Sequence, residues 1–294
     1  MRLRLLPATV VSLAIVLTGV PGSTALAGGD PVLVGAGDIA SCQTSGDTKT
    51  ARLVAAIPGT VFTTGDNAYG SGTLSEFESC YEPTWGAFKS RTRPSAGNHE
   101  YQTAGASGYF TYFGTDAGSP GQGWYAYDLG AWRVYALNST CSAVGGCDAG
   151  SPQTAWLEAD LAANPRRCVL AYWHHPLFSS GEHGNNPDVR PFWDALYAAH
   201  ADVVINGHDH DYERFGRQTP AGVASKTGIR EFVVGTGGAE RRPFGRIKPH
   251  SLSRNATTFG VLKLTLHAAS YDWQFVPQAG KTFTDARNGA PCRA

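Results

Sequence analysis

The stretch Val61-Phe62-Thr63-Thr64-Gly65-Asp66-Asn67-Ala68-Tyr69 joins a short apolar run to a polar cluster that directly follows it. Residues 61–64 predict a buried β-strand, and the cluster supplies a carboxylate and a phenol at the end of that strand. In α/β proteins, side chains at strand ends converge at one edge of a sheet, where the functional site lies. This stretch therefore predicts an α/β fold with its site at the strand ends.

Four further polar clusters share this arrangement. They are Gly37-Asp38-Ile39-Ala40, Gly97-Asn98-His99-Glu100, His174-His175-Pro176 and Gly207-His208-Asp209-His210. At least three of the four follow apolar runs that predict strands, at residues 32–34, 169–173 and 203–205. Together the five clusters offer carboxylate, phenol, carboxamide and imidazole groups, a mixture that suits iron, manganese or zinc.

Each cluster alone has a purely structural explanation. A Gly-Asp pair after a strand is most often a turn whose aspartate caps its own backbone, and a single histidine beside Trp173 is most often packed in the core. Taken together, the clusters favour a site. His208 and His210 place two imidazoles on one side of an extended backbone, and Asp38 and Asp66 end two different strands. The combination predicts a two-metal site.

The chain has 294 residues and a formal net charge of zero, so electrostatics favours neither nucleic acid nor an anionic membrane as a partner. Residues 1–27 predict a signal peptide, because a basic start and an apolar segment precede Ala25-Leu26-Ala27, an A-x-A cleavage site. An uncleaved membrane anchor is the alternative, although the apolar run is short for a bilayer. We therefore expect an exported protein whose residues 28–294 form one domain.

The chain has six cysteines, and all of them follow the predicted cleavage site. An even number in an exported chain predicts three disulfides that stabilise the fold. Cys141–Cys147 is the favoured pair because Val144-Gly145-Gly146 lets the chain turn back, and Cys42–Cys80 is a second expected pair. No two cysteines have C-x-x-C spacing, which argues against a zinc knuckle or a thioredoxin-like site.

Helices and strands alternate along the sequence, which predicts a layered α/β fold. We expect helices at residues 48–57, 74–88, 151–163 and 192–200. Further expected strands are residues 132–137 and 231–234, with a closing hairpin at 259–266 and 271–276. Residues 101–123 are rich in glycine and aromatic side chains, and we expect a long loop there, near the site.

The clusters and their order resemble the calcineurin-like metallophosphoesterase superfamily, and within it the purple acid phosphatase branch. Many members of the superfamily carry Asp-x-His in the first motif, where this chain has Ala40. The purple acid phosphatase branch lacks that histidine and has a tyrosine three residues after the second aspartate, the position of Tyr69. The resemblance covers residues 32–277. It implies an α-β-β-α sandwich of two mixed sheets with the metal site at the strand ends.

The resemblance also implies a role for each metal donor. It implies that Asp38, Tyr69 and His210 hold a first metal, a ferric iron. Asp66 would bridge both metals. The ligands of a second, divalent metal (iron, zinc or manganese) would be Asn98, His174 and His208.

The same resemblance implies a role or a position for three further histidines. His99 would contact the substrate phosphate, and His183, nine residues after His174, would act in acid/base catalysis. The alternative for His183 is a solvated loop histidine. His175 is expected to point away from the metals and to support packing.

The implied activity is hydrolysis of a small-molecule phosphate ester by direct attack of metal-bound hydroxide, without a phosphoenzyme. We expect a secreted phosphomonoesterase, with a phosphodiesterase or a non-catalytic metal-binding protein as alternatives. Gly35-Ala36-Gly37-Asp38-Ile39-Ala40 also matches the dinucleotide-binding pattern G-x-G-x-x-A. A dinucleotide-binding site is nevertheless disfavoured, because no helix is expected directly after this stretch and export would separate the chain from cellular NAD. No nucleic-acid or membrane partner is expected after signal cleavage.

Overall fold

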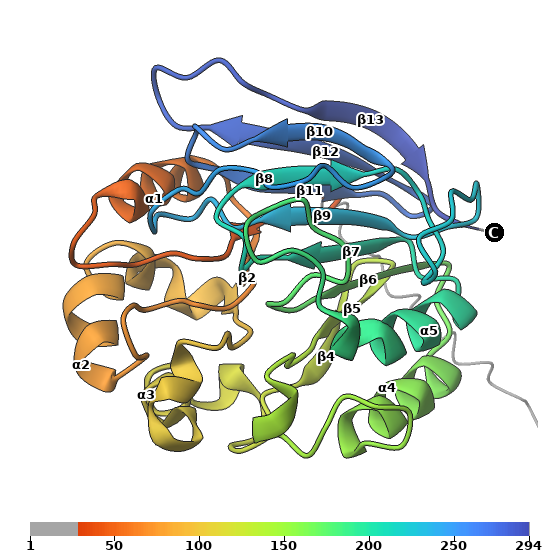
Figure 1. Ribbon diagram of the computed structural model, residues 1–294, viewed down its shortest axis with the longest axis horizontal. Coiled ribbons are helices and arrows are strands. Elements are labelled where there is room, and N and C mark those ends of the chain that lie inside the picture. Colours follow the sequence, from red (N-terminus) through yellow and green to blue (C-terminus); the bar gives the residue numbers. More distant parts are fainter. Residues whose placement is uncertain (1–28, 294) are drawn as a thin grey trace, which may run out of the picture.

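The computed structural model describes residues 29–293, so the predicted signal peptide lies outside the described part of the chain. Two mixed β-sheets stack on each other, and helices cover their outer sides (Figure 1). This arrangement confirms the expected α-β-β-α sandwich.

The first sheet contains six strands in the order β13-β12-β11-β1-β2-β3. Their bounds are β1 Val32–Ala36, β2 Thr60–Thr63, β3 Thr92–Arg93, β11 Gly260–Leu266, β12 Ser270–Pro277 and β13 Ala286–Pro291. β1, β2 and β3 run parallel, whereas β11, β12 and β13 pair antiparallel, so β11 and β12 form the predicted closing hairpin.

The second sheet contains seven strands in the order β10-β8-β9-β7-β6-β5-β4. Their bounds are β4 Tyr125–Leu129, β5 Trp132–Ala136, β6 Cys168–Tyr172, β7 Val203–Asn206, β8 Tyr212–Phe215, β9 Arg230–Val234 and β10 Ser251–Asn255. β5, β6, β7 and β9 run parallel in the middle of this sheet. Of these strands, β4, β8 and β10 come in addition to those predicted.

The α-helices are α1 Gly46–Ala56, α2 Leu74–Glu76, α3 Ser107–Phe113, α4 Pro152–Ala163 and α5 Arg190–Ala198. α4 begins as predicted, because the Ser151 side chain accepts from the backbone N–H of Thr154 and proline occupies the first turn. α4 and α5 lie side by side on the outer face of the second sheet (Figure 1).

Two buried clusters hold the layers together. Between the sheets, the ring of Phe62 on β2 packs against the ring of Tyr172 on β6, with centroids 5.7 Å apart. On the outer face of the second sheet, Trp173 packs against Phe192 of α5, with centroids 5.7 Å apart. Phe62 and Tyr172 lie near the ends of β2 and β6, so their packing gives the loops that follow these strands a rigid base.

Two predicted segments differ from the structure. Residues 74–88 do not form one helix: α2 continues into a π-helical turn, Phe77–Tyr81, and a separate 3₁₀ segment, Trp85–Arg91. Pro83 separates the two, because it lacks the N–H that a continuing helix requires. Residues 101–123 are not a plain loop, since they contain α3, whose Tyr109 and Phe113 are buried against Phe77.

The predicted three disulfides are present, and both favoured pairs are confirmed. The bonds are Cys42–Cys80, Cys141–Cys147 and Cys168–Cys292. The first joins the loop after β1 to the π-helical turn, and the third joins the start of β6 to the segment after β13. Within residues 29–293, no helix combines the length and apolar character needed to cross a membrane.

Candidate metal centre

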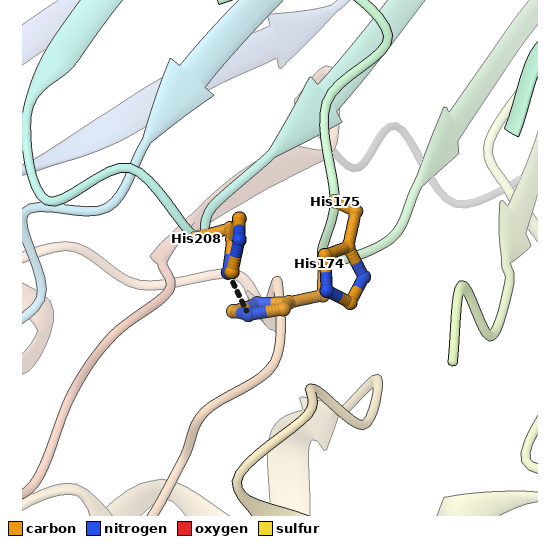
Figure 2. Close-up of side chains that lie close together, drawn as sticks. All are labelled: His174, His175 and His208. Carbon is orange, nitrogen blue, oxygen red and sulfur yellow. Dashed lines mark hydrogen bonds between the residues drawn. The ribbon is translucent and has the colours of Figure 1, made fainter. Parts of the chain in front are cut away.

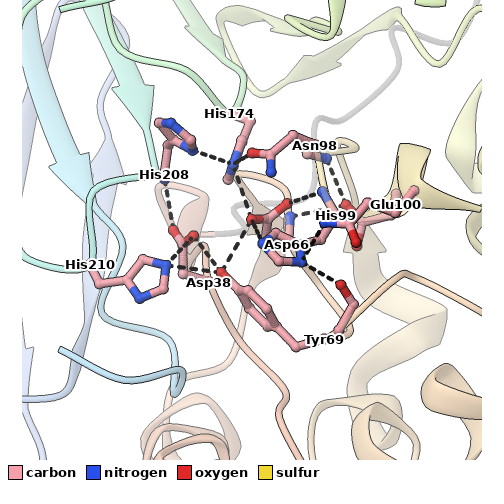
Figure 3. A network of polar contacts seen from close by, with 12 residues as sticks. Asp38, Asp66, Tyr69, Asn98, His99, Glu100, His174, His208 and His210 are labelled. Atoms are coloured by element: carbon pink, nitrogen blue, oxygen red, sulfur yellow. Dashed lines mark hydrogen bonds and ion pairs between the residues drawn. The ribbon is translucent and has the colours of Figure 1, made fainter. Parts of the chain in front are cut away.

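The predicted donors follow the carboxyl ends of parallel strands in both sheets, and Figure 3 shows them gathered in one place. In the first sheet, Asp38 follows β1, Asp66 and Tyr69 follow β2, and Asn98 follows β3. In the second sheet, His174 follows β6, and both His208 and His210 follow β7. The stacking of the two sheets thus brings donors from both to a common edge.

Three of these residues have a backbone conformation that is rare for side chains with a Cβ. The φ angles of Asp38, Asp66 and His208 are 58°, 48° and 70°. Such left-handed residues cost about 1–3 kcal/mol each and cluster at functional sites. Here each one reverses the chain directly after a strand and leaves its side chain at the common edge.

Asp38, Tyr69 and His210 form a first group of donors. The Tyr69 hydroxyl donates to Oδ1 of Asp38 at 2.8 Å and lies 3.1 Å from Nε2 of His210. Nδ1 of His210 lies 2.5 Å from the carbonyl oxygen of Glu240 and donates to it. Because Nδ1 carries the proton, Nε2 presents a lone pair to the group, as in imidazoles that bind metals.

Asn98, His174 and His208 form a second group. Nε2 of His174 lies 3.0 Å from Oδ1 of Asn98 and 3.1 Å from Nδ1 of His208 (Figures 2 and 3). Nδ1 of His174 donates to the carbonyl oxygen of Thr64 at 2.8 Å, so Nε2 is the ring nitrogen that faces the group. One carboxamide oxygen and two imidazole nitrogens therefore face one another.

The carboxylate of Asp66 lies between the two groups. Its Oδ2 is 3.2 Å from the Tyr69 hydroxyl and 3.3 Å from Nε2 of His174. Ligand atoms of Asp38, Asp66 and His174 all lie within 4.8 Å of one another, and all three residues are buried. One carboxylate thus belongs to both donor groups.

The electrostatics of this arrangement suits bound cations. Burial opposes a charged imidazole, but the Asp66 carboxylate raises the pKa of His174 to about 9. Burial and the carboxylates of Asp38 and Asp66 raise the pKa of the Tyr69 phenol well above 10. The negative charge of the buried carboxylates contributes to both shifts, and burial adds to it for Tyr69. Carboxylate, phenol, carboxamide and imidazole donors fit iron, zinc or manganese at this place.

The two predicted catalytic histidines lie beside these groups. His99 donates its backbone N–H to Oδ1 of Asp66 at 2.9 Å, and its Nε2 is 3.8 Å from Oδ2 of Asp66. The ring of His183 stacks on that of His208, with centroids 4.2 Å apart and planes at 28°. The structure therefore brings all nine predicted site residues to one region.

His175 differs from its expected position. Instead of pointing away, its ring packs against His208 with centroids 4.4 Å apart, and its nitrogen lies within 4.8 Å of ring nitrogens of His174 and His208. Figure 2 shows the three imidazoles together. The Ser139 hydroxyl accounts for this, because it contacts both Nδ1 and the backbone N–H of His175 at 2.9 Å. Burial, reinforced by His174, lowers the pKa of His175 to about 3, so the ring is neutral at neutral pH.

Glu100 is a supporting residue whose role the sequence did not indicate. Its buried carboxylate accepts from the backbone N–H groups of Asp66, Asn67 and Gly97 at 3.0, 2.7 and 2.6 Å. It therefore joins the turn after β2 to the turn after β3. Burial and the nearby Asp66 raise the pKa of Glu100 to about 7. The available signal was its place in the Gly97-Asn98-His99-Glu100 cluster.

Asp209 supports the other side of the site. It is buried, and its carboxylate accepts from the backbone N–H groups of His183 and Gly184 at 2.8 and 3.2 Å and from the Ser179 hydroxyl. Gly181 is required in this loop, because a Cβ there would overlap the Asp209 carboxylate. Asp209 thus holds residues 179–184 against the loop that carries His208 and His210.

A cavity of about 430 Å³ opens over the first donor group. Tyr69, His99 and His210 form part of its wall, together with Glu240 and Arg242. The volume is that of a small-molecule site.

Comparison with known proteins identifies the family. The family model described as calcineurin-like phosphoesterase matches residues 32–212, more than half of the chain. The chain therefore belongs to the calcineurin-like phosphoesterase family. Uncharacterized proteins from two strains of Mycobacterium tuberculosis are 31% identical over 143 residues, covering 41% of this chain and 27% of theirs. The matched part thus spans about a quarter of these relatives.

Several solved structures share the fold. A purple acid phosphatase from yellow lupin (Lupinus luteus) seeds has a TM-score of 0.70 at 20% identity, over 87% of this chain and 53% of that one. GAP50, described as the anchor in the inner membrane complex of Plasmodium, has a TM-score of 0.70 at 13% identity, over 91% of this chain and 90% of that one. PhoD has a TM-score of 0.55 at 12% identity, over 88% of this chain and 69% of that one.

Proposed function

We propose that this chain is a metal-dependent phosphoesterase that uses two metal ions and is of the purple acid phosphatase kind. The observation that carries the proposal is the position of Asp66, whose Oδ2 lies within 3.3 Å of both Tyr69 and His174. A carboxylate shared by two converging donor groups suits a pair of cations rather than one.

The proposed assignment gives each metal a distinct donor set. Asp38, Tyr69 and His210 would hold a ferric iron, because phenol and carboxylate oxygens favour a hard, highly charged ion. Asn98, His174 and His208 would hold a divalent iron, zinc or manganese. Asp66 would serve both. The presence of Tyr69 and the lack of a donor at Ala40 together support the purple acid phosphatase branch.

Bound metals would supply Lewis acidity toward phosphate oxygens and a water of lowered pKa. The protein would supply orientation and proton transfer. Nδ1 of His99 donates to the carbonyl oxygen of Gly70 at 2.5 Å, so this contact fixes the ring beside Asp66. His99, with a proton on Nε2 as well, would then donate to a phosphate oxygen, and His183 would give a proton to the leaving group. We expect direct displacement without a phosphoenzyme.

The preferred substrates would be small phosphomonoesters, which fit a cavity of about 430 Å³. A phosphodiesterase on the same site is the first alternative. A non-catalytic metal-binding protein is the second, since the fold also occurs in GAP50, a protein described as an anchor. The complete donor set of this chain supports catalysis over that second alternative.

Export is a further part of the proposal. The pattern of residues 1–27 and the three disulfides support a secreted or extracytoplasmic protein, with residues 28–294 as its metallophosphoesterase domain. Intact mass of the exported protein tests both points. A mature chain that begins at Gly28 and lacks six hydrogens relative to the fully reduced form is the expected result.

The activity is tested by metal analysis together with turnover of p-nitrophenyl phosphate and bis(p-nitrophenyl) phosphate. We expect two metals per chain and a higher kcat/KM for the monoester. His99→Ala should keep both metals and lower kcat on the order of 100-fold, the scale of one lost hydrogen-bond donor in an active site. His267→Ala is the control, because His267 pairs with Asp30 and Asp272 at the surface.

Each alternative predicts a different result. A higher kcat/KM for the bis ester would establish the phosphodiesterase. A protein that holds two metals and hydrolyses neither ester would establish the non-catalytic alternative.

A further inference from the structure

Arg242 lines the cavity over the first donor group, on the same wall as Glu240 and facing the same space as Tyr69, His99 and His210. Among the residues that line this cavity in the described part of the chain, it is the one lysine or arginine. No role follows for it from the five sequence clusters, since it lies outside all of them.

Two hydrogen bonds connect the segment that carries Arg242 to His210, a proposed metal donor. The backbone N–H of Arg242 donates to the carbonyl oxygen of His210 at 3.2 Å. In return, Nδ1 of His210 donates to the carbonyl oxygen of Glu240 at 2.5 Å. Arg242 therefore has a defined position relative to the site.

The present partners of the guanidinium leave it available to a ligand. Nη1 lies 2.7 Å from Nε2 of His183, and Nη2 donates to Glu240 at 3.1 Å, while Glu182 is 3.9 Å away. The side chains of Glu182 and Glu240 are 60% and 69% exposed. Ion pairs with such exposed groups contribute little to stability, so a phosphate can displace the two carboxylates at small cost.

We propose that Arg242 binds a phosphate oxygen of the substrate and thereby selects doubly charged phosphomonoesters. This inference rests on the proposed function and deepens it by naming a residue that sets the preference for monoesters over diesters. A guanidinium presents paired N–H donors that match phosphate oxygens, and hydrogen bonds to charged oxygens are the stronger ones. A phosphodiester replaces one charged oxygen by an ester oxygen, so it gains less from Arg242.

The test compares Arg242→Ala and Arg242→Lys with the neighbouring substitution Arg241→Ala. Arg241 is a matched control because its guanidinium stacks on Phe259 at 4.6 Å, donates to the carbonyl oxygen of Thr257, and does not line the cavity. Three quantities are measured on the metal-loaded proteins: affinity for inorganic phosphate by calorimetry, metal content, and kcat/KM for p-nitrophenyl phosphate and its bis ester.

Arg242→Ala should keep both metals and weaken phosphate binding by about tenfold or more, the scale of a lost charged hydrogen bond. Its loss of kcat/KM should be larger for the monoester than for the bis ester. Arg242→Lys should recover part of the affinity, since it keeps the charge but not the paired donors. Arg241→Ala should match the wild type.

Unchanged phosphate affinity in Arg242→Ala would overturn the inference, as would equal losses on both esters. Loss of metal together with phosphate binding would also overturn it, because the segment would then only support His210. If the wild type binds phosphate but hydrolyses neither ester, the proposed function fails, and the effect of Arg242→Ala on phosphate affinity still decides the binding role. A wild type that binds no phosphate would overturn both.

Discussion

The backbone N–H of His183 donates a hydrogen bond of 2.8 Å to Oδ1 of Asp209. Asp209 lies between His208 and His210 in the sequence, and its buried carboxylate also accepts from the Ser179 hydroxyl. The loop that presents His183 is therefore anchored to the loop that presents two proposed metal donors. This connection gives His183 a defined position beside the site.

His183→Ala should slow alkyl phosphates more than p-nitrophenyl phosphate. An alkoxide leaving group requires a proton, whereas p-nitrophenolate leaves without one, and general acid catalysis contributes on the order of 100-fold or more. The measurement is kcat for an alkyl and an aryl phosphate in wild type and variant. Equal losses on both esters would remove His183 as the acid.

Asp209→Asn should show the same leaving-group pattern with a smaller loss, because the amide keeps one acceptor and loses the charge. Asp202→Asn is the matched control: Asp202 is also buried and accepts from backbone N–H groups, those of Val169 and Arg293, away from the site. The control should lower stability without altering the ratio of alkyl to aryl rates. If Asp209→Asn also leaves that ratio unchanged, its positioning role is wrong.

Tyr69 should ligate ferric iron and give a visible phenolate-to-metal absorption band. Burial and the carboxylates of Asp38 and Asp66 raise the pKa of the phenol well above 10, so the metal-free protein should show no Tyr69 ionisation at neutral pH. Iron loading should produce the band, and Tyr69→Phe should remove it. A band that persists in iron-loaded Tyr69→Phe contradicts the assignment, and a colourless protein with only zinc or manganese would lie outside the purple branch.

The Cys168–Cys292 disulfide should contribute more to stability than Cys141–Cys147. The two bonds close loops with sequence separations of 124 and 6 residues. Chain entropy predicts contributions of about 5 and about 2 kcal/mol to the free energy of unfolding. Chemical denaturation of the two paired cysteine-to-alanine variants measures the difference. A larger loss for the Cys141–Cys147 variant would show that chain entropy does not set the order.

The order of motifs and the strand-end position of each cluster allowed the layered fold and the gathering of nine residues to be predicted. Those features depend on local patterns, such as an apolar run followed by Gly-Asp or Gly-His. The orientation of His175 could not be predicted from such a pattern, because it is set by Ser139, which lies 36 residues away. The place of Arg242 beside the site could not be predicted for the same reason, because Arg242 and His183 are 59 residues apart in the sequence.

The division of the predicted helix 74–88 at Pro83 was missed for a different reason. The spacing of apolar residues in 74–88 favours a helix throughout, and the proline that divides it is visible in the sequence. The helix α3 was not predicted, because the glycines of residues 101–123 indicated a loop. Its Tyr109 and Phe113 pack against Phe77, a contact that forms only in the folded chain. Tertiary packing overrode local composition there.

Asp66→Asn should be the most damaging single change among the proposed metal donors. Asp66 contacts both donor groups, so its loss weakens two sites, whereas Asn98 and His208 each belong to one. We expect a fall in kcat of about 100-fold or more, the scale of removing a preorganised charged group from a site. Asn98→Ala and His208→Ala should lose less metal and less activity.

The most direct test of the two-metal account is the number of metal ions per chain, measured by elemental mass spectrometry in wild type, Asp66→Asn, Asn98→Ala and His208→Ala. The account predicts two ions in the wild type, partial loss in Asn98→Ala and His208→Ala, and the largest loss in Asp66→Asn. An Asp66→Asn variant that keeps two ions and turns over p-nitrophenyl phosphate at a near-normal rate would contradict it.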